Sequence, residues 1–211
     1  MKRTLPWVIA VVATVAFVAS FSELQRMRAR FGEVTRHQFH DHQDVRAYMI
    51  RAALADLDQP IVVLGDSITE MARLPETING HPVVNAGVGG ATIGDFISLA
   101  PRLLDGVTPS LCVVALGAND IGSTSAGVHY TVMLSRLKTI CPKLLAYAVI
   151  PLEGSDLINK QIRAAAEVDS VPFVETPVPP GATLPDHIHL NAAGQRAWTA
   201  GLVAAIAAPR S

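Results

Sequence analysis

From residue 61 onward, short runs of apolar residues alternate with longer segments whose apolar residues recur at helical spacing. The predicted strands cover residues 61–64, 83–84, 111–116, 144–150 and 171–174. The predicted helices cover about 69–73, 93–104, 128–140, 157–168 and 192–208. This alternating order favours a parallel sheet with helices on both faces, and uninterrupted apolar strands suit the buried centre of such a sheet. The pattern therefore predicts an α/β fold with three layers.

The first 22 residues have a different pattern, with the basic pair Lys2-Arg3 followed by no charged residue at positions 4–22. A basic start before a run rich in Val and Ala is typical of an export signal. A signal peptide could be cleaved after Ser20, because Val18 and Ser20 are small, or an uncleaved helix could anchor the chain in a membrane. A buried or cytoplasm-facing helix is the third alternative. We expect an exported protein, periplasmic or extracellular, with residues 1–22 as signal peptide or membrane anchor.

Residues 23–59 are more polar and favour helix, so we predict a helical connecting segment before a catalytic domain at 60–211. His37, His40 and His42 lie close together in this segment. They could bind a metal, but they lack a second group of ligands at a recognisable spacing, and a solvated helix face explains them as well. We therefore predict no metal site.

The formal net charge of the 211-residue chain is -1, and no stripe of basic residues is present. A nucleic-acid partner needs such a stripe to neutralise phosphates, so we exclude one. The two cysteines, Cys112 and Cys141, could form a disulfide in an oxidising compartment, but two buried thiols are the favoured interpretation.

Candidate chemistry begins at Ser67, which lies between the first predicted strand and a helix. A serine there could merely cap the helix, or it could be a nucleophile if a base removes its proton. Asp186 and His189 are three residues apart, which places a carboxylate and an imidazole on one side of a turn-like backbone. His187 points elsewhere in that geometry, so we do not choose it as the base. Ser67 and this C-terminal segment both follow strands, whose carboxyl ends converge on the ligand-binding edge of an open α/β sheet.

Two further segments follow strands at the same edge. Residues 85–92 are rich in glycine, but Thr92 stands where a dinucleotide-binding loop needs glycine, and the Gly-Lys pair of a P-loop is absent. We expect the glycines here to let a backbone N–H approach a developing negative charge. Asn119 could simply end a strand and begin a turn, or its amide could donate to the same charge.

These residues together resemble the SGNH hydrolase superfamily, also called GDSL esterases and lipases, over residues 61–205. Four blocks occur in the family's order: Gly65-Asp66-Ser67, the glycine-rich segment with Gly90, Gly117-Ala118-Asn119-Asp120, and Asp186-His187-Ile188-His189. The assignment of the glycine donor to Gly90 leaves Gly87 and Gly89 as alternatives.

The resemblance implies a flavodoxin-like three-layer α/β/α sandwich with a parallel five-stranded sheet in the order 2-1-3-4-5. The larger α/β-hydrolase fold is the rival, and its nucleophile motif reads Gly-x-Ser-x-Gly. Thr69 replaces the second glycine here, and Asp186 lies beside His189, so both observations favour the smaller fold.

The resemblance also implies a serine hydrolase that cleaves short-chain or acetyl esters of a small molecule or a glycan, without a metal or organic cofactor. Ser67, His189 and Asp186 would be catalytic, and Ser67, Gly90 and Asn119 would form the oxyanion hole. Acyl transfer to an envelope polysaccharide, as an O-acetyltransferase or transacylase, is the alternative. A non-catalytic binding module is a second alternative, but it predicts the loss of a polar group, and none of these is missing.

Overall fold

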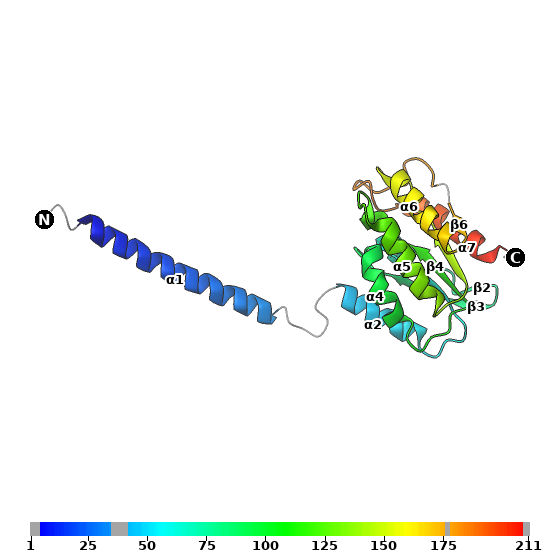
Figure 1. Cartoon of the computed structure of the whole chain (residues 1–211), viewed down its shortest axis with the longest axis horizontal. Helices are drawn as coiled ribbons and strands as arrows, with labels where there is room; N and C mark the ends of the chain where they lie inside the picture. The colour runs from blue at the N-terminus through cyan, green and yellow to red at the C-terminus, as the bar shows by residue number, and fades with distance from the viewer. Residues whose placement is uncertain (1–4, 35–41, 176–177, 209–211) are drawn as a thin grey trace. The chain divides into compact units, whose positions relative to one another are not determined.

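The computed structural model describes residues 5–34, 42–175 and 178–208. The chain divides into two compact units, Met1–Asp41 and His42–Ser211. In the first unit, helix α1 (Leu5–Val34) contains most of the segment predicted as a signal peptide or membrane anchor (Figure 1). Within the described ranges, no helix combines the length and the apolar character needed to cross a bilayer.

The second unit contains a six-stranded sheet. Its strands are β1 (Ile61–Gly65), β2 (Thr77–Ile78), β3 (His81–Gly87), β4 (Leu111–Ala115), β5 (Leu144–Tyr147) and β6 (Phe173–Val174), in the spatial order β2-β3-β1-β4-β5-β6. Five of the strands are parallel and follow the predicted order. The sixth strand, β2, pairs antiparallel with β3 and was not predicted, because two residues are too short for a hydrophobic pattern.

Helices cover both faces of this sheet, as predicted for a three-layer sandwich (Figure 1). The helices of this unit are α2 (His42–Leu54), α3 (Ser67–Glu70), α4 (Ile93–Leu103), α5 (Ala126–Lys138), α6 (Ser155–Val168) and α7 (Ala192–Ala207), with a 3-10 turn, η1, at Ala118–Asp120. Alternate residues of β1 face opposite layers. Val62 and Leu64 pack in the core shared with α2, α4, α5 and α6, whereas Ile61 and Val63 pack with α3 and α7.

The sequence left open whether Cys112 and Cys141 form a disulfide or remain two thiols. Cys112 and Cys141 are both buried, and both are free thiols. The favoured interpretation of two buried thiols therefore describes this structure.

The folded unit begins earlier than the predicted boundary at residue 60. Helix α2, which lies inside the predicted connecting segment 23–59, packs onto the core through Ile50 and Leu54, exposed by 1% and 2%. These are the buried residues of a largely polar helix, so the hydrophobic pattern of α2 is too weak to mark it as part of the domain.

Strand register brings the ends of the central strands together. Gly65 pairs with Gly87 of β3 and with Ala115 of β4, so three parallel strands end side by side. The segments that leave these strands contain Ser67, the glycine-rich loop and Asn119. The candidate residues therefore start from one edge of the sheet.

Candidate active site

Ser67 is the first residue of α3 and leaves the end of β1 through a tight turn. The preceding residue, Asp66, caps the helix, because its Oδ1 accepts a hydrogen bond of 3.0 Å from the Ile68 N–H. The turn also requires a glycine at position 65, since a Cβ there would overlap the side chain of Thr69. Helix capping is thus the role of Asp66, and the Ser67 hydroxyl is available for other chemistry.

The structure brings Ser67, His189 and Asp186 into one chain of contacts. Nε2 of His189 lies 2.9 Å from Oγ of Ser67, and Nδ1 of His189 lies 2.7 Å from Oδ2 of Asp186. Oδ1 of Asp186 accepts hydrogen bonds from the backbone N–H groups of Ile188 (2.9 Å) and His189 (3.0 Å). The carboxylate therefore holds both the imidazole and the backbone that carries it.

Electrostatics determine the direction of the hydrogen bonds in this chain. The hydrogen bond with His189, followed by the two backbone N–H groups, lowers the pKa of Asp186 to about 2. An ionised carboxylate can only accept, so Nδ1 of a neutral His189 carries the proton and Nε2 is the acceptor. Ser67 then donates its hydroxyl proton toward Nε2, which is the arrangement a general base requires.

His187 does not take part in the contacts among Ser67, His189 and Asp186. Its backbone has a left-handed conformation, with φ of 58°, and the residue is exposed. Because His189, and not His187, faces Ser67, the geometry agrees with the choice of base made from the sequence.

The loop after β3 presents Gly90 in a left-handed conformation, with φ of 75°, at an exposed position. The neighbouring N–H groups donate within the protein: Gly87 to Asn85 Oδ1, Val88 to Gly65 O, Gly89 to Glu70 Oε2, and Ala91 to Val88 O. In the described part of the chain, the Gly90 N–H has no such acceptor. Among the three glycines that the sequence left as alternatives, Gly90 is thus the one able to donate to a ligand.

Asn119 lies in η1, after β4, with its side chain beside the same loop. Its Nδ2 donates a hydrogen bond of 2.9 Å to the carbonyl oxygen of Ala91. An amide NH₂ has two hydrogens, so this bond orients the group and leaves a second donor. Asn119 is exposed and can therefore donate to a ligand at the edge of the sheet.

Asn85 is a site residue that sequence reasoning treated only as the start of the glycine-rich segment. Its Nδ2 donates to the carbonyl oxygens of Thr69 (2.6 Å) and Ala72 (3.0 Å), and its Oδ1 accepts from the Gly87 N–H (2.9 Å). The side chain therefore ties the segment after Ser67 to the glycine-rich loop. A polar residue within an otherwise apolar strand was the available signal.

Two buried carboxyl groups support the loops from below. Burial raises the pKa of Asp66 to about 6, and burial also raises the pKa of Asp120. Oδ2 of Asp120 accepts a hydrogen bond of 3.0 Å from the Ile93 N–H at the start of α4. Both groups stabilise backbone that leads to the site.

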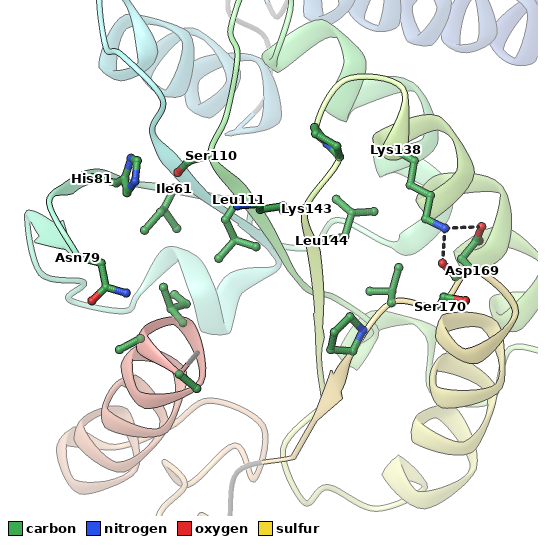
Figure 2. A pocket seen from close by; sticks show the side chains of 16 residues that line it. Ile61, Asn79, His81, Ser110, Leu111, Lys138, Lys143, Leu144, Asp169 and Ser170 are labelled. Atoms are coloured by element: carbon green, nitrogen blue, oxygen red, sulfur yellow. Dashed lines mark hydrogen bonds and ion pairs between the residues drawn. The ribbon is translucent and has the colours of Figure 1, made fainter. Parts of the chain in front are cut away.

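A cavity of about 720 Å³ lies at the other edge of the sheet and does not belong to this site (Figure 2). It is lined by Ile61, Leu111 and Leu144, the first residues of β1, β4 and β5. Lys138 contacts Asp169 at its rim, with 3.3 Å between Nζ and Oδ1. Ser67 follows the carboxyl end of β1, whereas the cavity is lined by the amino ends of the parallel strands. The cavity and the candidate site therefore lie at opposite ends of these strands.

The predicted histidine cluster is only partly described. His37 and His40 lie outside the described residues, whereas Nε2 of His42 lies 2.8 Å from Oε2 of Glu70. His42 thus contacts the helix that begins at Ser67.

Comparison with known proteins identifies the family of this arrangement. The model of the GDSL-like lipase/acylhydrolase family matches residues 63–197, a range that contains the serine, the glycine-rich loop, Asn119 and the Asp-His pair. The chain belongs to the GDSL-like lipase/acylhydrolase family. The predicted membership of the SGNH superfamily is therefore confirmed, and the family places the chain among the carboxylic ester hydrolases.

Relatives of this GDSL-family chain agree with the assignment. An arylesterase of Vibrio mimicus is 31% identical over 83 residues, which is 33% of this chain and 42% of that protein. The match thus spans less than half the length of the arylesterase. A GDSL-like lipase of Bacteroides thetaiotaomicron has a TM-score of 0.61 at 20% identity, covering 77% of this chain and 96% of that one.

An acetylxylan esterase of Geobacillus stearothermophilus also has a TM-score of 0.61, at 15% identity, and covers 75% of this chain and 99% of that one. The two solved structures show that the GDSL-family chain shares their fold.

Proposed function

We propose that the protein hydrolyses short-chain acyl esters through an acyl-enzyme on Ser67. The observation that carries the proposal is the 2.9 Å contact between Ser67 Oγ and His189 Nε2, with Asp186 on the other ring nitrogen. A hydroxyl, an imidazole and a carboxylate in this order form the arrangement that activates a serine nucleophile.

In the first half of the reaction, Oγ of Ser67 attacks the ester carbonyl carbon while its proton moves to Nε2 of His189. Asp186 stabilises the imidazolium that forms. The tetrahedral oxyanion accepts hydrogen bonds from the N–H groups of Ser67 and Gly90 and from the Asn119 amide. The C–O bond to the alcohol then breaks, and Nε2 returns the proton to the leaving oxygen.

In the second half, His189 removes a proton from water, whose oxygen attacks the acyl carbon. The bond to Ser67 breaks and Oγ regains its proton, so the acid is released and the enzyme is restored. All proton transfers pass through one imidazole, and no step needs a metal or organic cofactor.

The exposure of the site favours water over another alcohol as the acyl acceptor. The side chains of His189 and Asp186 are 31% and 43% exposed. Acyl transfer requires that the acyl-enzyme be protected from water, and an open edge provides little such protection. We therefore rank hydrolysis above transfer to an envelope polysaccharide.

A short acyl group is favoured by the packing behind the nucleophile. The cavity lined by Asp66, Ile68 and Trp198 has a volume of about 10 Å³. This space is barely enough for one water molecule, so it does not accept an acyl chain. The acyl group of a substrate would therefore lie at the open side of the site, where no buried tunnel among the described residues provides a binding surface for a long chain.

The predicted export remains part of this proposal. An exported enzyme would meet small-molecule or glycan-linked esters outside the cytoplasm, and fractionation of cells with an antibody to the chain tests it. Recovery of the chain with cytoplasmic proteins would contradict export and leave the chemistry unaffected.

The chemistry is tested with an aryl acetate, a substrate class suggested by the arylesterase relative. Ser67→Ala should abolish turnover while the circular dichroism spectrum remains that of the wild type. A panel of aryl esters from acetate to long-chain acyl should show the highest kcat/KM at acetate or propionate. Undiminished turnover by Ser67→Ala would refute the serine mechanism, and a preference for long chains would refute the short-chain assignment.

A further inference from the structure

Helix α2 is joined to the glycine-rich loop by a network of charged side chains that the proposed reaction does not use directly. Its centre is Glu70, which lies three residues after Ser67 at the end of α3. Oε2 of Glu70 accepts a hydrogen bond of 2.5 Å from the N–H of Gly89. Gly89 is the immediate neighbour of Gly90, so one carboxylate connects the nucleophile helix to the oxyanion loop.

Arg46 of α2 completes the network from the other side. Its Nε lies 3.3 Å from Oε1 of Glu70, and its Nε and Nη2 donate to the carbonyl oxygen of Gly87 at 3.0 and 2.9 Å. The guanidinium is planar and carries several donors, so it can hold a carboxylate and a carbonyl at the same time. The loop is thus held at Gly87 by Arg46 and at Gly89 by Glu70.

We infer that Glu70 and Arg46 are positioning residues, which act through Gly87 and Gly89 to aim the Gly90 N–H at the oxyanion of the ester reaction. This inference rests on the proposed function. An oxyanion hole works when its donors are already oriented before charge develops. Gly90 has a left-handed backbone with no side chain, so its own conformation is weakly restrained and its neighbours must set its direction.

The burial of the two side chains supports a specific role. The side chains of Arg46 and Glu70 are 16% and 19% exposed, although most charged side chains lie on the surface. A partly buried charge needs a partner. Removal of Glu70 takes away the carboxylate beside Arg46, and removal of Arg46 leaves Glu70 with only His42 and the Gly89 N–H as partners among the described contacts. The fit is also close, because a Cβ at Gly89 would lie 3.0 Å from Oε2 of Glu70 and 3.3 Å from Nε2 of His42.

The test uses Glu70→Ala, Glu70→Gln and Arg46→Ala in the full chain, with Arg51→Ala as the matched control. Arg51 also belongs to α2, but its guanidinium donates to the carbonyl oxygen of Arg102 in α4. Steady-state hydrolysis of an aryl acetate gives kcat and KM. Thermal unfolding shows whether each variant is folded at the assay temperature. Inhibition by a boronic acid, which forms a tetrahedral adduct with the serine, reports on oxyanion binding.

We expect Glu70→Ala and Arg46→Ala to lower kcat by about 10- to 100-fold, with KM within about twofold of the wild type. The loss is smaller than the about 10²–10³ that removal of an oriented donor typically costs, because the Gly90 N–H remains and only its direction is disturbed. Affinity for the boronic acid should fall in parallel. Glu70→Gln keeps an oxygen for the Gly89 N–H and should retain more activity than Glu70→Ala. Arg51→Ala should keep the wild-type kcat.

Three results distinguish a failure of this inference from a failure of the proposed function. If Ser67→Ala is inactive while Glu70→Ala and Arg46→Ala keep kcat and boronic acid affinity, the positioning role is wrong and the proposed function stands. If Arg51→Ala loses as much kcat as Arg46→Ala, the effect belongs to helix packing in general, and the inference fails. Activity of Ser67→Ala would instead refute the proposed function itself.

Discussion

Oγ of Ser67 lies 2.9 Å from Nε2 of His189, although 122 positions separate the two residues along the chain. Ser67 follows the first central strand, whereas His189 lies in the loop before the last helix. The parallel sheet brings these segments to one edge, where the imidazole can take the hydroxyl proton.

Replacement of the base should abolish most of the activity. His189→Ala removes the proton acceptor of Ser67, and we expect kcat for an aryl acetate to fall by about 10⁴-fold or more, as is typical for removal of a triad member. The matched control is His187→Asn, since asparagine tolerates the left-handed backbone at that position. The control should stay within twofold of the wild type, and equal losses in both variants would contradict the assignment of His189.

Replacement of the carboxylate tests the orientation of the imidazole. The pKa of Asp186 is lowered to about 2, so its contribution to stability is complete above its ordinary pKa of 3.8 and is lost only as the pH falls through about 2. Asp186 therefore stays ionised throughout the range of an assay from pH 5 to 9. Asp186→Asn should lower kcat by about 10³–10⁴-fold, and it should do so at every pH in this range. A defect confined to the acid end of the profile would contradict this role.

Removal of the Asn119 amide tests the oxyanion hole. Asn119→Ala should lower kcat for the aryl acetate by about 10²–10³-fold with little change in KM, because the donor acts mainly on the transition state. Asn159→Ala is the control, since the Asn159 side chain bonds only to the backbone of Val149 among the described contacts. The control should lower the midpoint of thermal unfolding and spare kcat. An increase in KM alone for Asn119→Ala would assign that residue to ground-state binding instead.

A substitution at the end of β3 tests the close approach of the strand to α3. A Cβ at Gly87 would overlap the backbone of Glu70, so Gly87→Ala should destabilise the fold by about 1–3 kcal/mol in urea unfolding. Gly106→Ala is the control, because Gly106 has φ of 76° with open space around it. We expect about 1 kcal/mol there, from the left-handed backbone alone. A smaller loss for Gly87→Ala than for Gly106→Ala would show that the strand end can relax.

The buried Asp66 predicts a pH dependence of stability. Burial raises its pKa from 3.8 to about 6, so between these values the folded protein holds a proton that the unfolded chain releases. The contribution of Asp66 to the free energy of unfolding should therefore decline as the pH rises from 4 to 6 and then level off. Urea unfolding of wild type and Asp66→Asn at pH 4 and pH 6.5 measures it, with the exposed Asp156→Asn as control. If the free energy of unfolding of Asp66→Asn changes between pH 4 and pH 6.5 by as much as that of the wild type, this assignment is wrong.

Several elements follow from residues that are close together in the sequence. Helix α4 was predicted at 93–104 and is observed at Ile93–Leu103, where the Thr92 and Asp95 side chains form a reciprocal cap at its start. Strand β3 extends to His81–Gly87, beyond the predicted 83–84, because Asn85 pairs with Val63 in the sheet although it interrupts the apolar pattern. Strand β3 is therefore longer than its hydrophobic pattern predicted, because backbone pairing continues through a polar residue.

Strand β5 shows the opposite difference. Apolar residues predicted a strand over 144–150, but β5 ends at Tyr147 because its neighbour β6 is only two residues long. Residues Ala148, Val149 and Ile150 remain buried without continuing the strand. Burial and pairing are separate properties, and the sequence pattern reports the first.

The pattern of residues along the chain was enough to predict the layered α/β architecture and to select Ser67, Asp186 and His189 as candidates, and the resemblance to the SGNH family added the order of the parallel strands. Apolar periodicity and short motifs depend on neighbouring positions, so they can be read along the chain. Three features required the three-dimensional arrangement: the available N–H of Gly90, the place of α2 in the folded unit, and the contacts of Arg46 and Glu70 with the loop. These features arise where distant segments meet, and the register of the strands and the packing of helices on the sheet set those contacts.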